Sequence, residues 1–256
     1  MNEIVGLLGL AAFVIASLLV GGRIALLAIR ARQLPETAMA LSLILSGGVG
    51  TALLVTPALL GNLEVGTVYR LSQLATISNH AGFVFLYLFV WRVFRPGDLW
   101  AACLVFSSTG ILLIGAVGTM VTLVPGGGFP GVNRAGDVWF WMSLLSRMVV
   151  YGWAMIESFR YYRMLKRRLA LGLASEVIVN RFFYWGVSMG AVLGIWINIA
   201  ITVLNLDLAW LVKINDLISA ALGFVVAGAV YLAFFPGSRE STVASSNAAS
   251  PEVAKR

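Results

Sequence analysis

Residues 82–117 read GFVFLYLFVWRVFRPGDLWAACLVFSSTGILLIGAV, two long apolar runs joined by the polar turn Arg95-Pro96-Gly97-Asp98. Because a helix rises about 1.5 Å per residue, a run of about 20 apolar residues crosses a hydrocarbon layer of about 30 Å. Similar runs recur along the 256 residues, of which 60% are hydrophobic and 11% charged, with a mean hydropathy of +0.92. The sequence therefore predicts an all-α integral membrane protein with no soluble catalytic domain.

Seven apolar segments are separated by short polar connections. They lie at about 4–29, 37–60, 67–93, 99–124, 138–162, 178–204 and 209–235. Residues 238–256 are rich in Ser, Ala and charge and cannot bury an apolar face, so we expect a disordered cytoplasmic tail. The prediction is a seven-transmembrane-helix bundle over residues 1–237 followed by this tail, with the first segment retained as a helix.

Positive charges predict the orientation, because Lys and Arg in short loops stay on the cytoplasmic side. Connections one, three and five carry Arg30, Arg32, Arg92, Arg95, Arg160, Arg163, Lys166, Arg167 and Arg168. The other connections contribute only Arg134 and the nearby Arg70. We therefore expect a multi-pass protein of the inner membrane, with its N-terminus outside and its C-terminus in the cytoplasm. This asymmetry accounts for the net charge of +7, so no nucleic-acid partner is expected.

The supply of reactive residues excludes several function classes. The single cysteine, Cys103, cannot form an intrachain disulfide, and the single histidine, His80, cannot provide both axial ligands of a haem. The motifs HExxH, CxxC and GxxxxGK do not occur. We therefore expect no catalytic residues, no metal, no cofactor and no enzyme activity. A retinal protein built on Lys213 is disfavoured, because residues 67–93 contain no carboxylate to serve as counterion.

An internal repeat relates the third apolar segment to the seventh. Residues 77–84 read Ile-Ser-x-x-x-Gly-Phe-Val, and residues 218–225 show the same pattern at an offset of about 140. Nearly the same offset places Glu36 on Glu176 and sets Ser46, Gly48 and Gly50 against Gly186, Ser188 and Gly190. The pattern indicates a 3+1+3 plan of two parallel halves, similar to that of sugar-transporter and PQ-loop proteins and broadly to that of opsins and G-protein-coupled receptors. Chance similarity between apolar helices is an equal alternative.

Polar residues inside apolar segments indicate a ligand site, because a charge near the bilayer centre costs about 2.5–3.5 kcal/mol without a partner or water. With the predicted orientation, these side chains converge on an outward-facing polar cavity. The candidate ligand-binding residues are Arg70, Gln73, Asn79, His80, Arg147, Asn198, Lys213 and Asp216. The excess of positive charge favours an anion or a carboxylate as ligand. Arg147 is the leading candidate because it is too central to reach the headgroups.

Structural roles compete with this interpretation. Lys213 and Asp216 are three residues apart and can neutralise each other, and Arg70 can reach the outer headgroups. Arg147 can form a buried pair with Asp216, and His80 can simply bond to a neighbouring helix. Nearer the cytoplasm, Glu157 and Arg160 are expected to pair, with Arg181 joining them.

Three glycines share one face of the sixth segment. Gly186, Gly190 and Gly194 are four residues apart, and the missing side chains let another helix approach closely. We expect them to pack against a helix of the same bundle.

The stretch ESFRYYRMLKRRLALGL at residues 157–173 and NRFFYWG at residues 180–186 resemble a group of uncharacterised bacterial seven-transmembrane-helix membrane proteins. So do Arg30-x-Arg32-x-x-Pro35-Glu36 and Arg92-Val-Phe-Arg-Pro96. The resemblance implies a bacterial membrane protein and carries no activity with it.

Two functions fit these features. The first is a sensor or receptor that binds a small ligand from outside and signals through its basic cytoplasmic loops to a cytoplasmic protein partner. The second is a small-solute transporter whose two three-helix halves move around the polar cavity. The sequence favours the sensor or receptor, with the transporter as the alternative.

Overall fold

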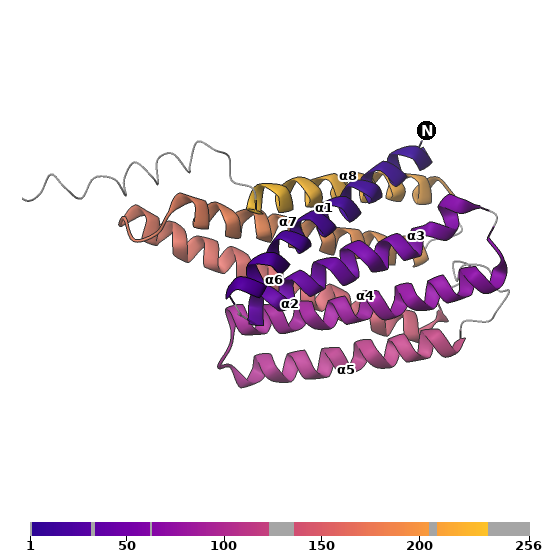
Figure 1. Ribbon diagram of the computed structural model, residues 1–256, viewed down its shortest axis with the longest axis horizontal. Coiled ribbons are helices and arrows are strands. Elements are labelled where there is room, and N and C mark those ends of the chain that lie inside the picture. Colours follow the sequence, from indigo (N-terminus) through magenta and orange to yellow (C-terminus); the bar gives the residue numbers. More distant parts are fainter. Residues whose placement is uncertain (1, 32–33, 62, 123–135, 205–208, 235–256) are drawn as a thin grey trace, which may run out of the picture.

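The computed structural model describes residues 2–31, 34–61, 63–122, 136–204 and 209–234, and every regular element in these ranges is a helix. The elements are α1 (Asn2–Ala31), α2 (Leu34–Ser42), η1 (Leu43–Gly50), α3 (Thr51–Leu60), α4 (Val65–Phe94), α5 (Leu99–Thr122), α6 (Val138–Ala170), α7 (Glu176–Leu204) and α8 (Ala209–Phe234) (Figure 1). α2, η1 and α3 follow one another without a break, so the helices coincide with the seven predicted segments. The predicted tail and most of the fourth and sixth connections lie outside the described residues.

The outer surface of the bundle is apolar, as a lipid environment requires. Leu26 and Ile29 on α1 and Phe106 and Val117 on α5 are all more than half exposed. Five helical stretches are long and apolar enough to cross a membrane: Leu8–Arg30, Leu34–Pro57, Val65–Phe94, Leu99–Val121 and Glu176–Leu204. α8 contributes the shorter apolar stretch Leu217–Ala233. The fold is therefore a helical membrane bundle.

The helices form a ring in which each packs against its neighbour in the sequence. α1 packs on α2 and η1, these pack on α4, and α6, α7 and α8 follow in order until α8 returns to α1. α4 also contacts α6, and α5 packs against the outside of this pair. The interior contains large side chains from several helices, including Phe83, Leu86, Tyr87, Trp153 and Met189.

η1 is a π-helical segment that interrupts α2 and α3, and hydroxyl groups account for it. Thr51 Oγ1 donates to the Ser46 carbonyl five residues earlier at 2.8 Å, and Ser46 Oγ donates to the Ser42 carbonyl at 2.7 Å. From α4, Ser78 Oγ donates to the Leu45 carbonyl at 2.7 Å. These side chains satisfy carbonyls of the widened turn. A π-helical turn inside a helix frequently marks a functional site.

Small residues let η1 lie close to its neighbours. A Cβ atom on Gly47 would overlap Ser17 of α1, and one on Gly50 would lie 2.6 Å from Asn79 Nδ2 of α4. On the facing side of α4, a Cβ atom on Gly82 would lie 2.6 Å from the Ser46 backbone nitrogen. Helix contact of this kind depends on residues without side chains.

The predicted cytoplasmic cations other than Arg32, which lies outside the described residues, gather at one end of the bundle. α1, α4, α6 and α8 end there, and α2, α5 and α7 begin there (Figure 1). The C-terminal part of α6 and the start of α7 extend beyond the other helices at this end as a hairpin (Figure 1).

Candidate functional site

The structure brings together two of the predicted ligand-binding residues, Arg147 of α6 and His80 of α4. His80 Nδ1 lies 2.7 Å from the Thr76 carbonyl oxygen, which only accepts, so Nδ1 carries the proton and donates. His80 Nε2 is then the acceptor for Arg147 Nη2 at 3.2 Å and Ser143 Oγ at 3.3 Å. The imidazole is therefore neutral in this arrangement, and all its hydrogen-bonding positions are occupied.

Aromatic rings hold the guanidinium of Arg147 in place. Its Cζ atom lies 5.0 Å from the centroid of the Phe83 ring and 4.8 Å from that of Trp196. The Tyr151 and Phe83 rings pack edge to face, with their centroids 5.9 Å apart. A cation over a desolvated aromatic ring is stabilised by about 2 kcal/mol or more. Arg147 thus connects α4, α6 and α7, which is a structural role.

Asn198 belongs to a separate polar cluster between α7 and α8. Its Nδ2 donates to the Asn215 carbonyl at 2.6 Å and to Ser219 Oγ at 2.7 Å. Asn215 Nδ2 donates in turn to Thr202 Oγ1 at 2.8 Å. These contacts join two neighbouring helices and do not reach the Arg147 cluster.

The remaining predicted site residues do not converge. Asn79 packs against Gly50 and donates to the Ala75 carbonyl at 3.0 Å, whereas Arg70 is exposed and Gln73 is half-buried. The side chains of Lys213 and Asp216 lie outside the described residues, so the pairs proposed for them stay predictions.

The glycine face of α7 contacts helices of the same bundle. A Cβ atom on Gly186 would lie 3.1 Å from the Phe159 ring, and one on Gly190 would lie 3.0 Å from Met155 Sδ, both on α6. A Cβ atom on Gly194 would lie 3.1 Å from Leu222 Cδ1 on α8. The three glycines thus lie against the two helices that flank α7.

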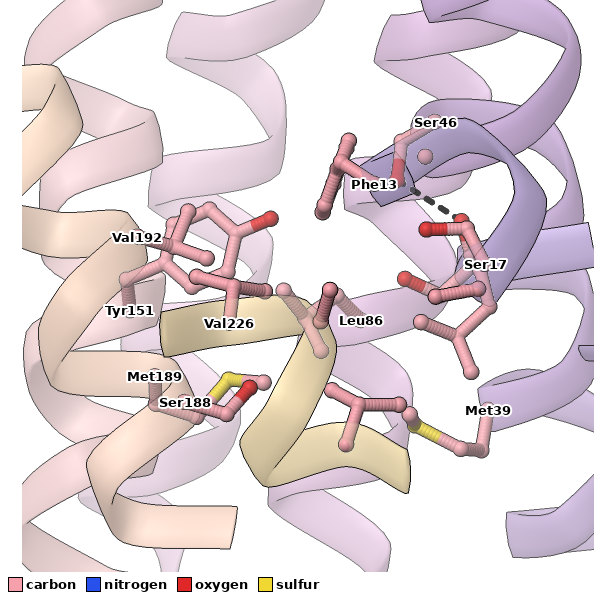
Figure 2. Close-up of a pocket in the computed structure, with 16 residues that line it drawn as sticks. Phe13, Ser17, Met39, Ser46, Leu86, Tyr151, Ser188, Met189, Val192 and Val226 are labelled. Atoms are coloured by element: carbon pink, nitrogen blue, oxygen red, sulfur yellow. Dashed lines mark hydrogen bonds between the residues drawn. The ribbon is translucent and has the colours of Figure 1, made fainter. Parts of the chain in front are cut away.

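A cavity lies at the centre of the bundle, and none of the predicted ligand-binding residues lines it. Its volume is about 30 Å³, which is room for about two water molecules. Figure 2 shows Tyr151 and Ser188 on one side of the cavity and Ser17 and Ser46 on the other. The lining residues are Phe13, Ala16, Ser17, Met39, Ser42, Leu43, Ser46, Gly47, Leu86, Tyr151, Ser188, Met189, Val192, Val226, Ala227 and Val230.

Ser188 is the most deeply buried of the polar side chains that line this cavity. The residue is fully buried (0% exposed), and its hydroxyl has no hydrogen-bond partner among the described residues. Ser46, across the cavity, donates to a helix carbonyl, as does the equally buried Ser158 to the Ala154 carbonyl at 2.6 Å. A buried hydroxyl left without a partner costs about 1–3 kcal/mol. Ser188 therefore retains the capacity to bond a molecule in the cavity.

At the basic end of the bundle, Glu157 is the centre of an ion-pair cluster. Arg95 donates two hydrogen bonds to the Glu157 carboxylate, from Nε to Oε1 at 3.0 Å and from Nη2 to Oε2 at 3.3 Å. Arg95 also donates to Asp98 at 3.3 Å, and Arg160 reaches Glu157 Oε1 at 3.3 Å. The hydrogen bond to Glu157 raises the pKa of Arg95 above its ordinary value, aided by the charges of Glu157 and Asp98.

The predicted pair of Glu157 and Arg160 is therefore confirmed, but the third member is wrong. Arg181 Nε donates instead to the Ala233 carbonyl at the end of α8, at 3.2 Å. Helix ends carry carbonyls without intrahelical partners, and these attract cations.

Sequence reasoning missed the cavity because it searched for charge, and the cavity is lined by hydroxyl and apolar groups. A signal was present in the repeat, which aligned residues 46–50 with residues 186–190; both stretches contribute to the cavity. It also missed a hydroxyl chain in which Tyr87 donates to the Ser146 carbonyl at 2.6 Å and Ser146 to the Ser108 carbonyl at 2.9 Å.

Comparison with protein-family models, curated proteins and solved structures gives no match for this chain. Among the described residues, no group of three or more His, Cys, Asp or Glu side chains is placed to hold a metal ion. The functional argument therefore rests on the geometry of the bundle.

Proposed function

We propose that the protein crosses the inner membrane seven times, with the N-terminus outside, and transports a small solute through the centre of the bundle. In this topology α6 and α8 cross the membrane in addition to the five apolar spans, because both pack beside α7 within the same ring. The gathering of cations at one end of the bundle supports the orientation. The low apolar content of α6 follows from Arg147, Glu157 and its basic end.

One observation carries the transport function: the cavity lies between two three-helix halves. We call α1, α2–η1–α3 and α4 the first half, and α6, α7 and α8 the second half. Every helix of both halves except α3 contributes lining residues, whereas α5 contributes none. Movement of one half against the other would open such a cavity to either side, as in transporters built from repeats.

The helix contacts support the 3+1+3 plan. α1 begins the first half and packs on α8, which ends the second half; α6 begins the second half and packs on α4, which ends the first. The contact between α1 and α8 and the contact between α6 and α4 therefore join equivalent helices of the two halves. η1 also fits this function, because transporters place irregular helices beside the substrate.

Transport is tested with the purified protein in liposomes. We expect faster entry of at least one solute than in empty liposomes, saturating with concentration, in stopped-flow light scattering. Ala227→Val narrows the cavity by two methyl groups and should slow this entry, whereas Ala221→Val, on the exposed face of α8, should not. Equal rates in both variants, or entry no faster than in empty liposomes, would contradict the proposal.

A receptor is the second candidate, and the hairpin of α6 and α7 favours it. Residues 158–170 of α6 extend about 20 Å beyond Glu157 and carry five exposed cations: Arg160, Arg163, Lys166, Arg167 and Arg168. With Glu157 placed near the inner membrane surface, this length would put the tip beyond the headgroup layer, where these charges suit an acidic cytoplasmic protein. Solute binding without solute entry would favour this function.

A further inference from the structure

We infer that the central cavity binds a small, uncharged solute with a hydroxyl or amide group, held by the Ser188 hydroxyl. The inference rests on the proposed role of the cavity as the solute site. It departs from the anion that the sequence favoured, because the charged residues behind that expectation do not line the cavity.

The absence of charge in the lining selects against ions. None of the described residues that line the cavity has an ionised side chain at neutral pH, and its polar groups are the hydroxyls of four serines and Tyr151. An ion entering this space would lose its hydration without meeting an opposite charge. An uncharged solute loses only hydrogen bonds to water, and hydroxyl groups can replace these.

Ser188 supplies a specific contact. Its oxygen is fully buried in the lining and has no partner among the described residues, so it can donate to a solute oxygen and accept from a solute hydroxyl or amide. Tyr151 lies on the same side (Figure 2). The opposite side presents Ser17 and Ser46 with Phe13 and Met39, which suits a solute with a short apolar portion.

The size of the cavity restricts the solute further. A volume of about 30 Å³ admits only a molecule or group of a few atoms while the halves are closed. The inference is therefore directed to compounds such as urea, acetamide, glycerol and erythritol, with the larger ones requiring partial separation of the halves.

The test measures solute entry into proteoliposomes for these four uncharged solutes and for two charged comparators, glycine and phosphate. We expect entry of at least one uncharged solute. Ser188→Ala should slow it about tenfold, the effect of losing one hydrogen bond. Ser158→Ala is the matched control, since this serine is equally buried but its hydroxyl is bonded within α6; it should leave the rate unchanged.

A second measurement separates this inference from the transport proposal. The unfolding temperature of the detergent-solubilised protein is recorded with each uncharged solute for wild type and Ser188→Ala. Comparing the two proteins in the same solute cancels general solvent effects of polyols. Stabilisation of wild type alone, without entry, would support the uncharged site and contradict transport. Entry of only glycine or phosphate would overturn the uncharged site and retain transport. Equal behaviour of wild type and Ser188→Ala in both assays would overturn the inference.

Discussion

The Arg147 cluster and the Ser188 cavity lie close together in the bundle interior, yet they differ in the hydrogen bonding of their central polar groups. Around Arg147, the His80 ring uses both nitrogens and aromatic rings cover the guanidinium. At the cavity, a fully buried hydroxyl has no partner among the described residues. Hydrogen-bonded polar groups fix a structure, whereas the Ser188 hydroxyl is open to a bound molecule because its residue lines a cavity. Other buried polar atoms without a hydrogen-bond partner among the described residues, such as Trp196 Nε1, belong to residues that do not line it.

The same contrast holds at the basic end, where Arg95 and Arg160 satisfy Glu157. The difference teaches that charge alone is a poor guide to function in this protein. Substitutions in the satisfied clusters should lower stability, whereas substitution of Ser188 should affect solute entry.

The largest loss is expected for Arg95→Met. Glu157 is only 2% exposed, so removal of its bidentate partner leaves a carboxylate dependent on Arg160. We expect the free energy of unfolding to fall by about 3 kcal/mol, measured by chemical denaturation in detergent. Arg92→Met, at an exposed position of the same helix end, is the control and should have a much smaller effect.

The double variant Arg95→Met/Glu157→Met sharpens this prediction. It removes both charges, and a buried ion pair replaced by apolar side chains is often neutral. We expect most of the lost stability to return. A double variant as unstable as the sum of the single variants would show that the cluster does not act as a pair.

Arg147→Lys should have the next largest effect. An ammonium group lacks the planar surface that fits between Phe83 and Trp196, so we expect a loss of about 1–2 kcal/mol. Arg70→Lys, at an exposed position on α4, should leave the unfolding midpoint unchanged. Solute entry should persist in folded Arg147→Lys. Loss of entry with unchanged stability would place Arg147 in the binding site and remove the contrast.

Much of the fold follows from the sequence, because apolar length determines where a helix crosses a membrane. The helix bounds differ from the predicted segments by a few residues, except at the basic end of α6. There the apolar run ends near residue 162, but the helix continues to Ala170, because Arg, Lys and Leu favour helix in water as well. η1 was not predicted, because it depends on Ser78 of another helix donating into the widened turn.

The candidate site was less predictable than the fold. Burial cost identified Arg147 and His80 as residues that need polar partners, because charge in hydrocarbon always needs partners, but it did not predict that they bond to each other. The same reasoning cannot locate a cavity, which depends on how side chains from different helices fill a shared space. Ser188 is uncharged, so burial cost does not single it out in the sequence. Its role depends on the cavity opposite its hydroxyl.

Asn198→Ala tests the mildest of the satisfied clusters. The side chain makes two short hydrogen bonds to α8, and such interhelical bonds in membranes contribute about 0.6 kcal/mol on average and rarely above 1.7 kcal/mol. We expect a loss of about 1 kcal/mol in detergent denaturation. Ile197→Ala, at the adjacent exposed position, controls for changes to α7 itself. A loss of 3 kcal/mol or more would mean that this cluster supports more than the contact between α7 and α8.

Ser188→Ala should have the smallest effect on stability and the opposite sign. Removing a hydroxyl that has no partner relieves the cost of its desolvation and leaves a methyl group in an apolar lining, so we expect stabilisation of up to about 1 kcal/mol. Ser158→Ala, which breaks a hydrogen bond of 2.6 Å, should destabilise or leave stability unchanged. Equal losses in the two variants would show that Ser188 is satisfied in the folded protein. A stabilised Ser188→Ala protein with slow solute entry would instead indicate that the protein tolerates an unsatisfied group because its substrate requires one.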